Sequence, residues 1–216
     1  MTVIRRESPD LLALQELRGF DRQRIATLAD ALGMTAHLAP SRFGQAVAVL
    51  VRPPLCIDRT DTVTWRLHHA AAAVTTGRLT LVSTHLNPWS AYRRYREATW
   101  LAARYGRRGR ALIAGDMNGL SPFDDAPPDA QDRDDRRAIA AFDRAGLVDL
   151  WRKAGVGSGL TVPTTGDVGD AFLPMRLDYV FGTPAVAEQV REVQVLRGNE
   201  IEYASDHYPV RVELDA

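Results

Sequence analysis

Short apolar runs with the continuous or alternating pattern of β-strands recur along this chain, separated by breaks that contain glycine and proline. Gly77 fits the turn of a hairpin that enters the run at Leu79. Other strands are predicted at 36–39, 45–51, 63–67 and 70–75. Helical spacing is present instead at 22–34, 92–105 and 139–146. Because strands and helices do not alternate regularly, the pattern favours a layered α+β fold over a doubly wound sheet.

Two of the predicted helices have a clear apolar face. In 92–105 the face is a stripe of Tyr95, Ala98, Ala102 and Tyr105. In 22–34, Gly33 stands where a helix would stop. The stretch 121–135 is rich in proline and aspartate, so we expect a solvated loop whose acidity does not bind metal.

Composition adds limits to this picture. The 216 residues are 45% apolar and 25% charged, which predicts a single globular domain spanning residues 1–216 with a sizeable core. The 27 basic and 27 acidic residues cancel, so the chain lacks the global positive field of a protein that holds long nucleic acid by charge alone. A local phosphate site remains allowed.

Cysteine usage and hydropathy bear on the compartment. Cys56 is the only cysteine, so no intrachain disulfide can form. No segment has the pattern of a signal peptide, and the longest apolar runs have the length of strands rather than of membrane-spanning helices. The sequence therefore predicts a cytoplasmic protein without a membrane span.

The most informative feature is that several apolar runs end or begin on a residue able to bind metal or move a proton. Three runs end on such a residue, one opens on one, and a pair stands just before the last run; they are Glu16, His85, Asp116, Asp178, Asp206 and His207. Burying a charge is costly unless a cation or hydrogen bonds compensate it. Antiparallel pairing would bring all these ends to one edge, so we expect one shared polar site.

The motifs around these residues resemble, in order and spacing, those of the endonuclease/exonuclease/phosphatase superfamily. The matching segments are Leu14-Gln15-Glu16, Ser83-Thr84-His85-Leu86, Gly115-Asp116-Met117-Asn118, Arg176-Leu177-Asp178-Tyr179 and Ser205-Asp206-His207. The resemblance implies a four-layer α/β/β/α sandwich of two mostly antiparallel sheets flanked by helices. It also implies divalent-metal-dependent hydrolysis of phosphate esters, with a phosphodiesterase or nuclease as the expected form.

The resemblance assigns metal binding to Glu16 and Asp206. A carboxylate is a hard ligand suited to Mg2+ or Mn2+, which keep several waters and need few protein ligands. His207 is then the general base or a phosphate contact, work that a histidine can do near neutral pH. The alternatives are a surface ion pair for Glu16 and an ordinary turn before the last strand for the Asp-His pair.

The remaining catalytic assignments also come from the resemblance. Asp116 orients or activates water, and Asn118, two residues further on an extended segment, holds a phosphoryl oxygen. Asp178 orients a site histidine, and His85 contacts the phosphate or the transition state. Each assignment has a purely structural alternative. These are a turn after Gly115 for the first pair, a buried polar group for Asp178, and a core histidine with its hydrogen bonds satisfied for His85.

Other candidates are weaker. His68 and His69 have no partner at metal-ligand spacing, so a structural role is expected for both. Arg176 could clamp a phosphate or lie exposed on its strand.

The chain departs from the family pattern at its start, because the usual N-terminal first strand, which carries a site asparagine, is not seen before Glu16. Its absence would leave neighbouring strands with unpaired backbone near 11–15 and 210–214. A homodimer through this exposed sheet edge is one way to complete the sheet. A phosphate- or metal-binding relative with weak or no catalysis is the alternative function. The expected partner is a phosphate-ester substrate: nucleic acid, a nucleotide or a small phosphodiester.

Overall fold

The computed structural model describes residues 1–125, 136–165 and 173–215. The first half of the chain forms α1 (Thr2–Glu7), β1 (Leu11–Arg18), α2 (Arg22–Leu32), β2 (Thr35–Ala39), β3 (Gln45–Val51), β4 (Arg59–Val63), β5 (Ala71–Thr76), β6 (Leu79–His85) and α3 (Ala91–Tyr105). The second half forms β7 (Ala111–Asp116), α4 (Arg137–Arg144), β8 (Val148–Asp149), α5 (Leu150–Ala154), β9 (Gly155–Val156), β10 (Asp178–Gly182), α6 (Pro184–Ala187), β11 (Val190–Val195), the 3-10 helix η1 (Asn199–Tyr203) and β12 (Val210–Leu214).

A six-stranded sheet forms the centre of the fold. Its strand order is β4-β5-β6-β7-β10-β8. β6 and β7 run parallel because α3 returns the chain between them, and the other pairs in this sheet are antiparallel. The parallel pair and the antiparallel β10 therefore place the end of β6, the end of β7 and the start of β10 at one edge of the sheet.

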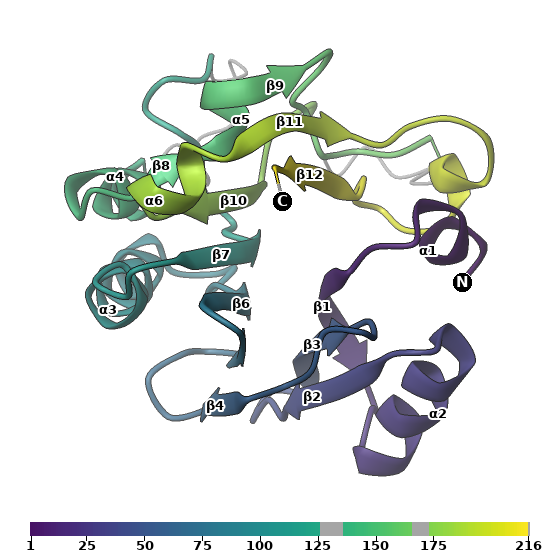
Figure 1. The fold of residues 1–216 in the computed structure, drawn as a ribbon. Coiled ribbons are helices and arrows are strands. Elements are labelled where there is room, and N and C mark those ends of the chain that lie inside the picture. Colours follow the sequence, from purple (N-terminus) through teal and green to yellow (C-terminus); the bar gives the residue numbers. More distant parts are fainter. Residues whose placement is uncertain (126–135, 166–172, 216) are drawn as a thin grey trace.

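Two three-stranded sheets, β1-β3-β2 and β12-β11-β9, face the six-stranded sheet (Figure 1). The core between the layers includes Val49 of β3, Val74 of β5 and Val193 of β11. On the far face of the large sheet, α3 and α4 pack on Tyr179 and Phe181. α2 covers the outer face of β1-β3-β2 through Ile25, Ala29 and Leu32. The expected four-layer α/β/β/α sandwich is confirmed.

Within the described residues, β1 and β12 each pair with a strand on one side only, β1 with β3 and β12 with β11. The ion pair between Arg211 and Glu7, at 3.4 Å, ties β12 to the segment that leads into β1. The structure thus has the two unpaired strand edges that the family resemblance led us to expect. Homodimerisation through these edges stays a prediction.

Most predicted elements are present, with one misplaced strand. The helix at 22–34 ends where expected, at Gly33, whose φ of 64° is the left-handed conformation that glycine adopts readily. The strand predicted at 63–67 is wrong: β4 lies earlier, at Arg59–Val63, as an edge strand with a mostly polar sequence. An edge strand needs only one paired side and little apolar surface, so its sequence carried a weak signal.

None of the helices in the described part of the chain is long and apolar enough to cross a membrane. Most of the loop predicted at 121–135 lies outside the described residues. In the described portion, the carboxylate of Asp124 binds Arg176 at 2.8 Å rather than being freely solvated.

Candidate active site

Three candidate residues lie in register on adjacent strands of the large sheet. His85, the last residue of β6, is the register partner of Asp116, the last residue of β7. Asp116 is in turn the partner of Asp178, the first residue of β10. Tyr179 and Phe181 point into the helix-covered core, whereas Val180 packs between the sheets, so strand alternation puts Asp178 on the inter-sheet side as expected.

Asp116, Asn118 and His85 form one buried hydrogen-bonded cluster. The Asn118 amide N–H donates to Asp116 Oδ1 at 2.7 Å, and the Asn118 side-chain amide lies 2.9 Å from His85 Nε2. His85 Nε2 is 3.3 Å from Asp116 Oδ2. Asn118 has a φ of 48°, a left-handed conformation that places its side chain back over the cluster.

The electrostatics of this cluster favour an ion pair. Burial disfavours the charge of Asp116, but the hydrogen bond and charge of His85 and the charge of His207 lower the pKa of Asp116. Burial also opposes the charged form of His85, yet its contacts with Asp116 raise the pKa of His85, helped by the charges of Glu16 and Asp178. Three further candidates, Glu16, Asp178 and His207, therefore lie within electrostatic reach of His85 or of Asp116.

His207 joins the site through Asp178. Its Nδ1 lies 2.8 Å from Asp178 Oδ2. Burial opposes the charged imidazolium, but the charge and hydrogen bond of Asp178, followed by the charges of Asp116 and Asp206, raise the pKa of His207 to about 10. Because Nδ1 is held by Asp178, Nε2 is the ring nitrogen left for a substrate.

Glu16 sits on a bulge of β1 that lies against the large sheet. The pairing of β1 with β3 shifts register between Leu14 and Leu17, and Glu16 has a φ of 55°, which is strained for a residue with a side chain. Ser83 of β6 holds the bulge, because its Oγ donates to the Leu14 carbonyl and accepts from Gln15 Nε2, both at 2.9 Å. The bulge turns the Glu16 carboxylate out of the ladder, and that carboxylate is 46% exposed beside Arg18 at 3.3 Å.

Glu16 and Asp206 offer the oxygen donors that a divalent cation would need. Both are exposed, and Asp206 Oδ1 accepts a hydrogen bond from Ser205 at 3.2 Å. No group of three or more His, Cys, Asp or Glu side chains in the described ranges could hold a metal ion by itself. Mg2+ binds through one or two carboxylates, waters and substrate phosphates, so the donor chemistry fits an open site and not a closed cage.

Arg176 belongs to the scaffold, and both roles considered for it from sequence are wrong. It is 4% exposed and makes two bidentate carboxylate pairs, with Asp149 at 2.7 and 3.0 Å and with Asp124 at 2.8 and 3.0 Å. These pairs raise the pKa of Arg176 despite its burial. Four of its five N–H donors are thus engaged by carboxylates within the scaffold, which fixes the guanidinium away from a phosphate-clamping role.

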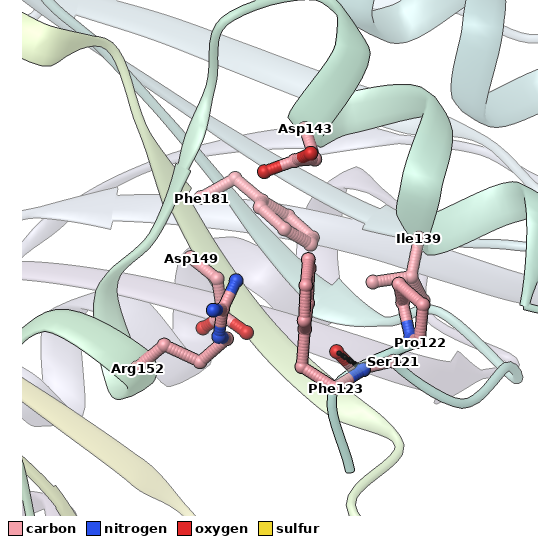
Figure 2. Close-up of a pocket in the computed structure, with 8 residues that line it drawn as sticks. All are labelled: Ser121, Pro122, Phe123, Ile139, Asp143, Asp149, Arg152 and Phe181. Atoms are coloured by element: carbon pink, nitrogen blue, oxygen red, sulfur yellow. Dashed lines mark hydrogen bonds between the residues drawn. The ribbon is translucent and has the colours of Figure 1, made fainter.

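Figure 2 shows the pocket beside these carboxylates, where Phe123 lies next to Phe181 and the Arg152 guanidinium reaches toward Phe123. The Arg152 guanidinium carbon is 3.5 Å from the centre of the Phe123 ring. None of the catalytic or metal candidates lines this pocket, and its Asp149 is already held by Arg176. The pocket is therefore part of the packing around β10 and not of the candidate active site.

Replacing Arg176 with methionine is expected to lower the free energy of unfolding by about 3–5 kcal/mol, because two carboxylates lose their buried partner. Chemical denaturation followed by circular dichroism measures this. The matched control is Arg191→Met, which removes an exposed pair with Asp215 at 2.6 Å and should cost about 1 kcal/mol or less. Equal effects of the two substitutions would contradict the scaffold role of Arg176.

The sequence prediction missed two buried residues next to the catalytic cluster. The His69 ring lies 4.5 Å from the His85 ring, so His69 is at the site and not in a remote core. Glu97 of α3 accepts hydrogen bonds from the backbone N–H of His68, at 2.6 Å, and of Asn87, at 2.7 Å. It thereby joins the loop that carries His69 to the loop that follows His85. The available signal was the His-His pair directly before an apolar strand.

Comparison with known proteins identifies the family to which the chain belongs. Residues 1–207 match the model of the Endonuclease/Exonuclease/phosphatase family. No curated protein sequence matches the chain.

Among solved structures, the chain is similar to an AP endonuclease from Archaeoglobus fulgidus, with a TM-score of 0.82 and 20% identity over 100% of this chain and 92% of that one. It is also similar to a 3′ phosphatase from Neisseria bound to a product DNA hairpin, with a TM-score of 0.80 and 21% identity over 100% and 92%. A mannosyl-6-phosphatase from Bacteroides thetaiotaomicron gives a TM-score of 0.70 and 16% identity over 100% and 88%. At these identities the likeness establishes the shared fold.

Proposed function

Because this chain belongs to the endonuclease/exonuclease/phosphatase family, whose enzymes hydrolyse phosphate esters, we propose that it is a divalent-metal-dependent phosphodiesterase of the nuclease type. The observation that carries the proposal is the alignment of His85, Asp116 and Asp178 on three adjacent strands, with His207 bonded to Asp178 at 2.8 Å. A scaffold domain would gain nothing from three titratable groups placed side by side at one sheet edge.

In this proposal Mg2+ or Mn2+ is held by Glu16 and Asp206, which present hard oxygen ligands at an open edge. The cation, when bound, supplies positive charge against the phosphoryl oxygens and the leaving oxygen. The positive φ of Glu16 supports this role, because strain of this kind is usually retained where the side chain has to reach a site.

The chain's own residues account for water activation and phosphate binding. Asp116, kept ionised by His85 and His207, accepts a proton from the attacking water and aligns it. Asn118 holds a phosphoryl oxygen by exchanging one of the hydrogen bonds that its side-chain amide makes to His85, Leu86 and Asp116 for one to the substrate. His207, whose raised pKa of about 10 keeps its ring protonated near neutral pH, presents Nε2–H to the substrate as a phosphate contact, while Asp178 fixes its ring. His85 contacts the phosphate from the end of β6.

A non-catalytic phosphate- or metal-binding relative is the second candidate, and the unpaired edges of β1 and β12 favour it. An incompletely paired β1 would hold Glu16 less rigidly, and a site displaced by about 1 Å loses much of its rate. Such a protein would still bind cation or phosphate without turnover.

The two candidates predict different results in one pair of measurements. We expect hydrolysis of a phosphodiester in the presence of Mg2+ or Mn2+ and its loss in EDTA, together with a rise of melting temperature on adding the cation. A cation-dependent rise without turnover would select the binding relative. Neither response would contradict both.

A substrate panel then narrows the class. It should contain single- and double-stranded DNA, DNA with an abasic site, RNA, a 3′-phosphorylated oligonucleotide, a sugar phosphate and bis-p-nitrophenyl phosphate. We expect cleavage of phosphodiesters in preference to phosphate monoesters.

A further inference from the structure

His69 is a buried histidine with an unsatisfied ring nitrogen next to the catalytic cluster. It is 3% exposed, and its Nε2 has no hydrogen-bond partner among the described residues. Leaving a buried donor or acceptor without a hydrogen bond costs about 1–3 kcal/mol, so such atoms are rare in folded proteins. If His69 served packing alone, nothing would offset this destabilisation.

The hydrogen bonds of Ser41 indicate which ring nitrogen of His69 carries the proton. Ser41 Oγ accepts from the Phe43 amide N–H at 3.1 Å and lies 3.4 Å from His69 Nδ1. The hydroxyl hydrogen of Ser41 is free to point at Nδ1, and we assign Ser41 as the donor and Nδ1 as the acceptor. In a neutral imidazole the other nitrogen then bears the hydrogen, so the unsatisfied Nε2 of His69 is a donor.

His69 is neutral across the working pH range. Burial, reinforced by the nearby His85 and His68, lowers the pKa of His69 to about 3. The charges of Asp116 and Arg18 also act on this ring, so both groups lie within electrostatic reach of it. A neutral N–H in that position can donate to an anion without itself being titrated.

The ring is held rigidly against His85. Phe43 stacks on His68 at 4.1 Å, His68 meets His69 edge-on at 4.5 Å, and His69 lies over His85 at 4.5 Å. Glu97 fixes the loop ahead of His69 through the His68 N–H. His85 Nδ1 is also buried without a partner among the described residues, so the two unsatisfied imidazole nitrogens belong to two neighbouring rings.

We propose that His69 is a further catalytic residue, whose Nε2–H donates a hydrogen bond to a non-bridging phosphoryl oxygen of the bound phosphate ester. A phosphoryl oxygen supplies the acceptor that this atom lacks among the described residues, and a rigid donor shielded from water stabilises developing negative charge. This inference rests on the proposed phosphoesterase function. No metal role is assigned to the histidines, since no described group of three ligating side chains includes them.

The test compares variants that keep or remove the donor. His69→Phe keeps a ring between His68 and His85 but removes the N–H, and His69→Leu is a second variant without a donor. His69→Gln places an amide N–H near the position of Nε2. His37→Phe is the matched control, because His37 is a half-buried histidine whose Nε2 already makes a hydrogen bond with Thr62 Oγ1, at 3.0 Å.

We expect His69→Phe to reduce kcat/KM about a hundredfold, the loss typical of removing one such donor. Its melting temperature should equal or exceed that of the parent, because the unsatisfied N–H is gone. His69→Gln should retain activity within about fivefold, and His37→Phe should leave activity unchanged. Parent-like activity of His69→Phe, or equal losses in the Phe, Leu and Gln variants, would overturn the proposal.

Inorganic phosphate provides a readout without turnover. The rise in melting temperature that phosphate produces should be largely lost in His69→Phe and kept in His69→Gln. If the parent hydrolyses no phosphate ester, the proposed function fails, yet this measurement still tests His69. An equal phosphate response in the parent and in His69→Phe rejects the role of His69 even if the parent is an active enzyme.

Discussion

Glu16→Gln is expected to reduce kcat about a thousandfold at saturating Mg2+, equivalent to about 4 kcal/mol of transition-state stabilisation. Glutamine keeps the shape and hydrogen-bonding capacity of the side chain but removes the charge that binds the cation. The carboxylate is exposed and its contact is a surface pair with Arg18, so the free energy of unfolding without metal should change by less than about 0.5 kcal/mol.

Steady-state kinetics over a range of Mg2+ and thermal unfolding with and without Mg2+ measure these effects. The cation-dependent rise of melting temperature should disappear in Glu16→Gln. Arg18→Met is the matched control, because it breaks the same ion pair and leaves the carboxylate in place. If Arg18→Met loses as much activity as Glu16→Gln, the ion pair and not the metal explains the effect. Full turnover of Glu16→Gln at saturating Mg2+ would exclude Glu16 as a ligand.

The second large effect is expected at the groups assigned to the attacking water and the phosphate. Asp116→Asn and His207→Ala should each lower the single-turnover rate by about two to four orders of magnitude. The double variant should lose less than the product of the two single losses, because the charges of Asp116 and His207 act on each other within one site.

Single-turnover measurements are required so that product release does not mask the chemical step. Asp178→Asn supplies the control for the His207 arm: if Asp178 acts by orienting His207, adding Asp178→Asn to His207→Ala should cost little more. Losses that multiply fully in the Asp116–His207 double variant would show that the two residues do not share a step.

The local pattern of apolar residues was sufficient to predict the position of a helix or strand that buries one continuous face. The helix stripe of Ala98, Ala102 and Tyr105 is buried against the large sheet as its spacing predicted, and β3 occupies the predicted residues 45–51. Pattern was insufficient for β4, whose edge position needs few apolar residues, and for the short elements after α4. Those elements obtain their stability from neighbours that are distant in the sequence.

The sequence by itself indicated that His85, Asp116, Asp178 and His207 would lie close together. Strand ends that carry carboxylates or imidazoles have to converge where their charge can be compensated, and the order of those motifs is that of one family. Periodicity also indicated the layered α+β fold, because it is a local property, whereas the unpaired edges of β1 and β12 were expected from the family resemblance.

Only the tertiary structure decided what each polar side chain binds. Arg176 pairs with carboxylates that lie 27 and 52 residues away in the sequence, and no local pattern announces such partners. His69 is next to the site because the loop before β5 packs its ring against the ring of His85, which lies on the neighbouring strand β6. Hydrogen bonding and burial are properties of three-dimensional neighbourhoods, so the same residue type can be scaffold or site according to what surrounds it.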